Sequence, residues 1–233
     1  MKLKPNTKYL FLHIPKTGGT TLRNIIYNSF DDSIIYPNRA ELRANKGKYL
    51  THQEILLNTD ILKDKKIIFG HYGFNYQKLF DENVITICFF RNPISRTLSH
   101  LNHLRIKGEL TDTDVYKLQH IKPISNIQSR YMGYVTGKDN FNTAKINISK
   151  VNIIGLTDEY DKSLKIINKI LDWNLEAISP LNDNSEDYFK FSDQLISKIS
   201  KTNYQDFILY HLASKIFDQQ VISILNNSSN VSI

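Results

Sequence analysis

The sequence is poor in cysteine and in long apolar runs, and both features exclude classes of protein. Its 233 residues include one cysteine, Cys88, which can form no disulfide within the chain. Cys88 lies in the apolar run VITICFF, which predicts a small buried side chain rather than a reactive thiol. No run approaches the roughly 18 uncharged apolar residues that cross a bilayer, and MKLKPNTK is not followed by a signal-type apolar region. We therefore expect a cytoplasmic protein without an integral membrane segment.

Acidic residues are outnumbered by basic ones, which gives a formal net charge of +7 and favours an anionic partner. Nucleic acid is disfavoured as that partner, because we find no helix-turn-helix signature, zinc-ligand spacing or aromatic single-strand platform. Phosphorylated nucleotides and acidic sugars stay open. The apolar residues are spread throughout the chain, which predicts one globular domain over residues 1–233.

Short apolar runs alternate with helical patterns along most of the chain. The predicted strands are residues 8–14, 66–69, 84–90 and 151–154, the last closed by Gly155. Helices are predicted over 20–30 and 95–105, after a cap at Thr157, and between 194 and 225, with a polar loop at 182–187 and a frayed tail from 226. Strands that are apolar at nearly every position are typical of a parallel sheet. We therefore predict an α/β fold, a three-layer sandwich with ligands at the carboxyl ends of the strands.

The segment HIPKTGGTTL lies between the first strand and the first helix. Gly18 and Gly19 let the backbone approach a ligand, and the helix that follows directs free amides and the positive end of its dipole at the same place. Lys16 adds a mobile charge, and hydroxyl donors come from Thr17, Thr20 and Thr21. The segment therefore suits an anion, although a glycine-rich turn with a solvated lysine would look similar.

This loop differs from the nucleotide-triphosphate loop G-x-x-x-x-G-K-[ST], in which the lysine follows the last glycine. Here Lys16 precedes both glycines, and the third strand ends at Arg91 instead of an acidic magnesium ligand. Both features disfavour a kinase.

A second segment, FFRNPISRTLSH, contributes different donors. Arg91 at the end of a strand can present a planar fork to a phosphate, and Ser99, two turns into the next helix, can add a hydrogen bond. Taken alone, Arg91 would be interpreted as a salt bridge and Ser99 as an exposed polar residue. Two such segments, each after a strand, together favour a nucleotide that carries a terminal phosphate monoester.

HIPKTGGTTL and FFRNPISRTLSH resemble the 5′-phosphosulfate loop and the 3′-phosphate segment of sulfotransferases that use 3′-phosphoadenosine 5′-phosphosulfate (PAPS). The resemblance is to the carbohydrate branch, which includes the heparan sulfate 2-O-sulfotransferases. The segments NIQSRYMG, NIIGLTDEYDKSL and NYQDFILYHLA are also similar to segments of this branch, so that the likeness spans most of the chain. It implies a P-loop NTPase-like sulfotransferase fold.

The resemblance also implies the chemistry. PAPS would be the co-substrate and 3′-phosphoadenosine 5′-phosphate (PAP) the product, with no catalytic metal. Lys16 would stabilise the leaving phosphate oxygen. A histidine that titrates near neutrality suits the base, and His71 in KIIFGHYGF follows a strand end and resembles the segment that carries the base. His13 is interpreted as a packed core histidine, whereas His100 and His103 either line the cleft or face solvent.

The acceptor is expected to be a carbohydrate or glycan hydroxyl. Asn126, Gln128 and Arg130 are candidates to line the cleft with His100, and Arg130 could meet an acidic acceptor or the nucleotide. A helix packed by its apolar residues is an equal alternative. Residues 38–53 and 106–123 are the expected specificity elements. We expect no N-terminal membrane anchor of the kind that eukaryotic relatives have, so a bacterial glycan, a lipid-linked sugar or a small metabolite is as plausible an acceptor as heparan. A P-loop-type nucleotide kinase and a noncatalytic nucleotide-binding module are the alternative functions.

Overall fold

The computed structural model describes residues 1–80, 83–135, 138–178 and 191–229. The strands are β1 (Thr7–Leu12), β2 (Ile35–Tyr36), β3 (Ile67–Gly70), β4 (Asn83–Phe90), β5 (Tyr134–Val135), β6 (Lys138–Asp139) and β7 (Ile153–Leu156). The α-helices are α1 (Gly19–Ser29), α2 (Arg39–Ala44), α3 (His52–Leu57), α4 (Pro93–Ile106), α5 (Leu118–Ile121), α6 (Ile127–Gly133), α7 (Phe141–Ile148), α8 (Tyr160–Leu171), α9 (Asp193–Thr202) and α10 (Tyr204–Ser229).

Five strands form one parallel sheet in the order β2-β3-β1-β4-β7. β1 lies at its centre, with Leu12 in register with Gly70 on one side and with Cys88 on the other. Every residue of β1, β3 and β7 is buried, as expected for parallel strands covered on both faces. The predicted α/β fold with a parallel central sheet is confirmed, and so is the burial of Cys88.

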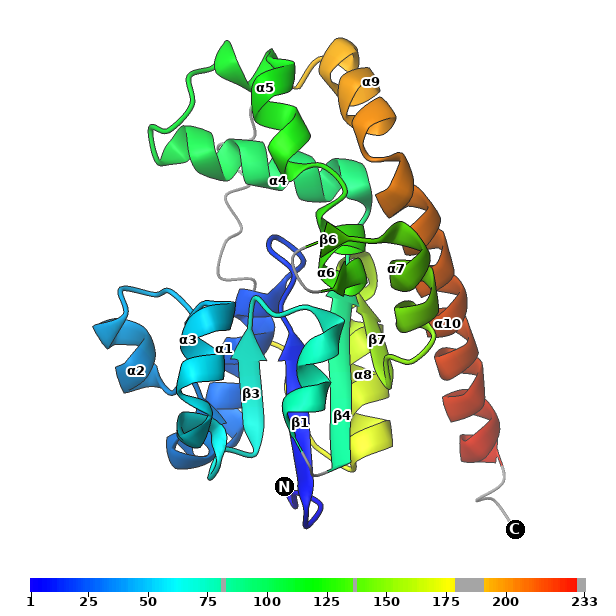
Figure 1. The fold of residues 1–233 in the computed structure, drawn as a ribbon. Coiled ribbons are helices and arrows are strands. Elements are labelled where there is room, and N and C mark those ends of the chain that lie inside the picture. Colours follow the sequence, from blue (N-terminus) through cyan, green and yellow to red (C-terminus); the bar gives the residue numbers. More distant parts are fainter. Residues whose placement is uncertain (81–82, 136–137, 179–190, 230–233) are drawn as a thin grey trace.

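Helices cover both faces of this sheet, which makes a three-layer arrangement (Figure 1). α1 and α8 lie on one face, where Trp173 packs between Phe30 and Tyr9. α6 and α7 lie on the other face, and α10 runs along the β7 edge in contact with α6, α7 and α8. The buried aliphatic and aromatic side chains of the sheet and these helices form the main core.

A second hydrophobic cluster lies beyond the carboxyl ends of the strands. It joins α4, α5 and α9 through buried Leu101, Ile121, Leu195 and Ile199 (Figure 1). These three helices therefore have a core of their own, and α4 stands directly above the ends of the strands. No helix in the described part of the chain is long and apolar enough to cross a membrane.

Several predicted boundaries are wrong. β7 begins two residues later than expected, and Gly155 lies within it instead of closing it. A Cβ at this position would lie 2.6 Å from the Phe89 ring on β4, so the glycine leaves room for that ring. Thr157 does not cap α8; it lies in a 3-10 turn, and its hydroxyl donates to the carbonyls of Thr17 and Phe90. α10 continues through 226 to Ser229, where a frayed tail was expected. The predicted loop at 182–187 lies outside the described residues.

Candidate functional site

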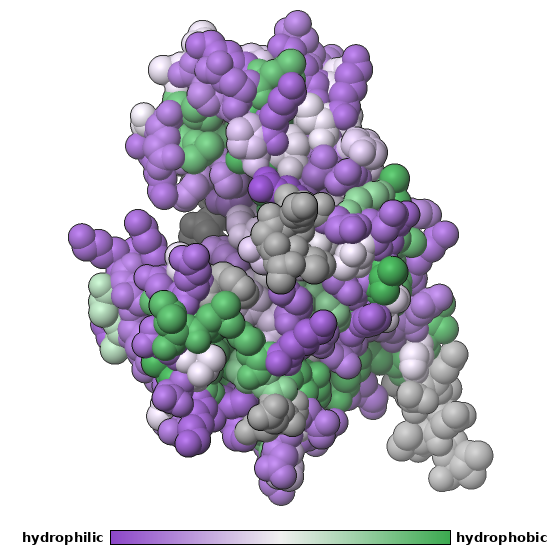
Figure 2. All heavy atoms as spheres, in the orientation of Figure 1, coloured by the Kyte–Doolittle hydropathy of each residue, from purple (hydrophilic) through white to green (hydrophobic). Residues whose placement is uncertain are grey.

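A cleft of about 610 Å³ opens at the carboxyl ends of β1, β3 and β4, below α4. Figure 2 shows the surface hollowed between the helical part made of α4, α5 and α9 and the body that contains the sheet. Among the described residues that line the cleft there is no aspartate or glutamate. The basic side chains and histidines among them are Lys16, Arg23, Arg91, Lys107, His13, His71, His100 and His103. The cleft is therefore built for an anion.

The loop between β1 and α1 holds its backbone in a conformation suited to anion binding. Lys16 has φ 71° and Gly18 has φ 82°, both in the left-handed region, which is unusual for a lysine. α1 has no side-chain cap, and among the described residues the amides of 19–21 meet no acceptor. A helix start with open amides attracts negative charge. The sequence prediction of a loop that opens a helix is confirmed.

Three neighbouring groups fix this loop from different directions. The Thr17 hydroxyl is buried and donates to the carbonyl of Ile14 at 2.9 Å. Thr157 donates to the carbonyl of Thr17 at 2.8 Å, and the Tyr160 ring packs where a Cβ on Gly18 would lie. Thr17 therefore shapes the loop from inside, in contrast to the expectation that its hydroxyl faces a ligand.

The Lys16 side chain lines the cleft and is surrounded by positive charge. Burial lowers the pKa of the Lys16 ammonium from 10.5, and the charge of Arg91 lowers it further. A bound polyanion would relieve this repulsion, because opposite charge favours the protonated form.

Arg91 follows β4 and is held at its backbone by Gln128. The Gln128 side chain accepts from the Arg91 amide and donates to the Arg91 carbonyl, both at 2.9 Å. The guanidinium donates to the carbonyl of Lys16 at 3.3 Å, which joins the two segments identified in the sequence. Gln128 is in turn placed by buried Asp206, which accepts the amides of Gln128 and Ser129 at the start of α6.

α4 turns one face toward the cleft. Ser95 and Ser99, one turn apart, line the cleft together with His103. His100 also lines it, and burial, with the charge of Arg96 next, lowers the pKa of His100 to about 4. Ser99 thus lines the same cleft as Arg91.

Three buried nitrogens at the cleft have no hydrogen-bond partner among the described residues. They are Nε of Arg23, Nε of Arg91 and Nδ1 of His100. Buried polar groups without partners are rare and costly, and the two guanidinium nitrogens can only donate. Both guanidinium groups also line the cleft, so an anion bound there would compensate their charge.

His71 follows β3 and lines the cleft, where its side chain is partly open to solvent and partly enclosed by the protein. Its Nδ1 donates to the carbonyl of His13 at 2.7 Å, and a carbonyl can only accept, so the proton is on Nδ1. The Nε2 lone pair is therefore free to accept a proton. Burial by the surrounding protein lowers the pKa of His71 from 6.5, while the hydrogen bond to His13 raises it.

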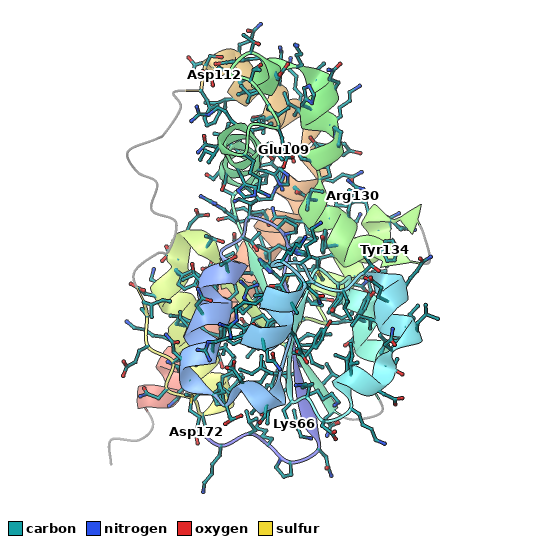
Figure 3. All side chains as sticks on the ribbon, turned by 90° about the vertical axis from the view of Figure 1, so that its left-hand side faces the viewer. Lys66, Glu109, Asp112, Arg130, Tyr134 and Asp172 are labelled. Atoms are coloured by element: carbon teal, nitrogen blue, oxygen red, sulfur yellow. The ribbon has the colours of Figure 1, made fainter. Side chains whose placement is uncertain are left out.

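His71 also borders a second cavity, of about 450 Å³. α6 supplies three of the residues that line this cavity, among them Arg130 and Tyr131, and Tyr134 follows α6 directly. Tyr76 comes from η3 (Phe74–Leu79). Figure 3 shows Arg130 and Tyr134 on the same side of the molecule, at α6 and just after it. The imidazole thus borders both a basic cleft and a cavity with three tyrosines in its wall.

The structure brings together only part of the predicted site. Lys16, Thr20, His71, Arg91, Ser99 and His100 line the cleft, whereas Thr17, Gly18, Gly19 and Thr21 do not. Gln128 is fully buried against Arg91, so the expectation that it lines the cleft is wrong. Arg130 lines the second cavity and donates to the carbonyl of Pro123.

Sequence reasoning missed Arg23, Tyr49, Ser95 and Lys107. Arg23 lies one turn after Thr20 on α1, and Ser95 one turn before Ser99 on α4, so helical spacing from the predicted residues could have found both. Tyr49 comes from the expected specificity stretch 38–53, which folds into α2, α3 and the segment between them. No local signal in that stretch singles out Tyr49.

Replacing Gln128 with leucine is expected to lower the free energy of unfolding by about 1–3 kcal/mol, because the buried amide and carbonyl of Arg91 lose their partners. The same change should weaken binding of anions that contact Arg91. Chemical denaturation and anion titration measure the two effects. Gln119→Leu, at an exposed position of α5, is the matched control. Equal stability of the two variants would contradict the assigned role of Gln128.

No protein-family model matches this chain, and no curated protein is significantly similar to it in sequence. The assignment of a function therefore depends on the residues and the geometry of the cleft.

Proposed function

We propose that the protein is a PAPS-dependent sulfotransferase that acts on a hydroxyl of a carbohydrate or glycan. The observation that carries this proposal is the basic cleft, which brings the open amides of α1 and Lys16 together with Arg91 and Ser99. Two separate groups of anion donors suit a nucleotide with phosphate at both ends. The guanidinium groups of Arg23 and Arg91 add positive charge that a bound polyanion would compensate.

In this proposal the loop amides and Thr20 hold the 5′-phosphosulfate, and Arg91 and Ser99 hold the 3′-phosphate. The acceptor oxygen attacks sulfur in line, the bond from sulfur to the bridging oxygen breaks, and its electron pair stays on the 5′-phosphate of PAP. Lys16 stabilises that developing charge. The acceptor proton passes to Nε2 of His71, the nitrogen left free by the hydrogen bond to His13.

The second cavity is the proposed acceptor site, because His71 borders both cavities. Tyrosine rings offer flat apolar surfaces and hydroxyls to a sugar, and Arg130 offers positive charge to an acidic group on it. A base between donor and acceptor is the arrangement that direct transfer needs.

A P-loop-type kinase is less well supported, because the strand end that would hold magnesium carries Arg91 and the lysine precedes the glycines. A noncatalytic nucleotide-binding module would use the same cleft. Such a module would need no base such as His71 where the cleft meets the second cavity. The position of His71 favours an enzyme.

The proposal is tested by incubating the protein with PAPS, EDTA and a panel of neutral and uronic-acid-bearing oligosaccharides. Release of PAP together with a sulfated sugar, identified by mass spectrometry, is the expected result. Magnesium-dependent consumption of ATP without use of PAPS would overturn it in favour of a kinase. Binding of PAP without turnover on any acceptor of the panel would favour the noncatalytic module.

A further inference from the structure

Four side chains on one wall of the cleft form a connected cluster: Arg23, Tyr49, His13 and His71. Arg23 Nη1 lies 2.6 Å from the Tyr49 hydroxyl, and Nδ1 of His13 lies 3.0 Å from the same hydroxyl. The Tyr49 ring meets both imidazoles edge-on, with centroids 5.7 Å from that of His13 and 4.7 Å from that of His71. The cluster therefore connects α1, the segment before α3, and the ends of β1 and β3.

The hydrogen bonds in this cluster favour one tautomer of His13. A guanidinium can only donate, so the Tyr49 oxygen accepts from Arg23, and the Tyr49 hydroxyl hydrogen is left available to donate to Nδ1 of His13. Burial foremost, and the charge of His71 next, lower the pKa of His13 well below 6.5, which keeps the ring neutral at pH 7. A neutral imidazole that accepts at Nδ1 carries its proton on Nε2.

That Nε2 edge faces the start of α1. A Cβ on Gly19 would lie 2.0 Å from Cδ2 and 2.3 Å from Nε2 of His13, so the glycine is needed for the loop to lie against this edge of the ring. Nε2 has no hydrogen-bond partner in the described part of the chain, although His13 is largely buried. The ring lines the same cleft as Lys16 and the open amides of α1.

We propose that His13 is a further catalytic residue, whose neutral Nε2–H donates to a sulfuryl or 5′-phosphate oxygen held by the loop, and that Tyr49 and Arg23 are positioning residues that fix its tautomer. This inference rests on the proposed function. His71 and His13 then have opposite roles at Nε2: His71 accepts a proton from the acceptor, and His13 donates a hydrogen bond to the transferred group. A neutral donor remains in place without exchanging its proton during the reaction.

Long-range proton–nitrogen NMR of the histidine rings tests the tautomer directly. The wild-type protein should show His13 with its proton on Nε2, and saturation with PAP should shift that nitrogen. Tyr49→Phe should convert His13 to a mixture of tautomers. The control is Tyr27→Phe: Tyr27 lies on the same helix as Arg23, but its hydroxyl donates to the Pro37 carbonyl, so its loss should leave the His13 tautomer unchanged. A wild-type proton on Nδ1, or an Nε2 signal unmoved by bound PAP, would overturn the inference.

Kinetics separate this role from packing. His13→Gln keeps an amide N–H near the place of Nε2–H, so its kcat should exceed that of His13→Leu by about tenfold or more, and Tyr49→Phe should lower kcat by about tenfold. Equal kcat in the glutamine and leucine variants would assign His13 to packing alone. PAP binding with no response at His13 rejects this inference and leaves the proposed function intact, whereas failure to bind PAP rejects the proposed function.

Discussion

Replacing Lys16 with methionine is expected to lower kcat for sulfuryl transfer by about two to three orders of magnitude, the effect of removing one donor that stabilises developing charge. Methionine has a side chain of similar length, and the left-handed backbone at this position is about equally unfavourable for lysine and for methionine. PAP should still bind, because the loop amides and Arg91 are unchanged. Steady-state kinetics with PAPS and a titration with PAP measure the two quantities.

Lys107→Met provides the contrast within the same cleft. Lys107 directly follows α4 and lines the cleft. Its charge lowers the pKa of Lys16 less than burial and the charge of Arg91 do. We expect this variant to raise KM with little change in kcat, since it removes attraction that acts equally on bound substrate and transition state. If Lys16→Met behaved in the same way, Lys16 would be a binding residue and the proposed role at the leaving oxygen would be wrong.

Replacing His71 with asparagine should lower kcat/KM by about two to four orders of magnitude, the range for loss of a positioned base. Asparagine can keep the hydrogen bond to the His13 carbonyl while it removes Nε2, so the fold and PAP binding should be preserved. His211→Asn, exposed on α10, is the control for the same change outside the site.

The pH dependence of His71 follows from its environment. A general base must be unprotonated, and burial lowers the pKa of His71 from 6.5, so wild-type kcat/KM should rise with pH along a limb centred below 6.5 and then stay level. The asparagine variant should lack this limb. A rate that falls as pH rises through the same range would indicate that a protonated imidazole is required and would contradict the assignment of His71 as base.

The parallel sheet could be predicted because its strands are continuous apolar runs that end at glycine, proline or arginine. Lys16, Arg91 and Ser99 were found for the same reason: each follows a strand by a fixed number of residues, and the ends of parallel strands lie on one edge of the sheet. Residues placed by a single local element are therefore within reach of sequence reasoning.

The errors concern contacts made across the fold. Gln128 was expected to meet a ligand. No residue near it in sequence reveals that both ends of its side-chain amide bond the backbone of Arg91, which is distant in the chain. Thr157 looked like a helix cap, yet its hydroxyl meets the loop at Thr17. His13 was correctly predicted to be packed and hydrogen-bonded, but its contact with Tyr49 depends on how residues 38–53 fold over the cleft.

The central claim is that the cleft recognises a nucleotide with a 3′-phosphate, and calorimetric titration of PAP without magnesium tests it most directly. Wild-type protein should bind PAP more tightly than ATP, and Arg91→Ala should weaken PAP binding by about tenfold to a hundredfold, because a charge-assisted hydrogen bond contributes about 1.5–3 kcal/mol. PAP affinity that is the same in both proteins, or ATP binding that is tighter and requires magnesium, would contradict the account.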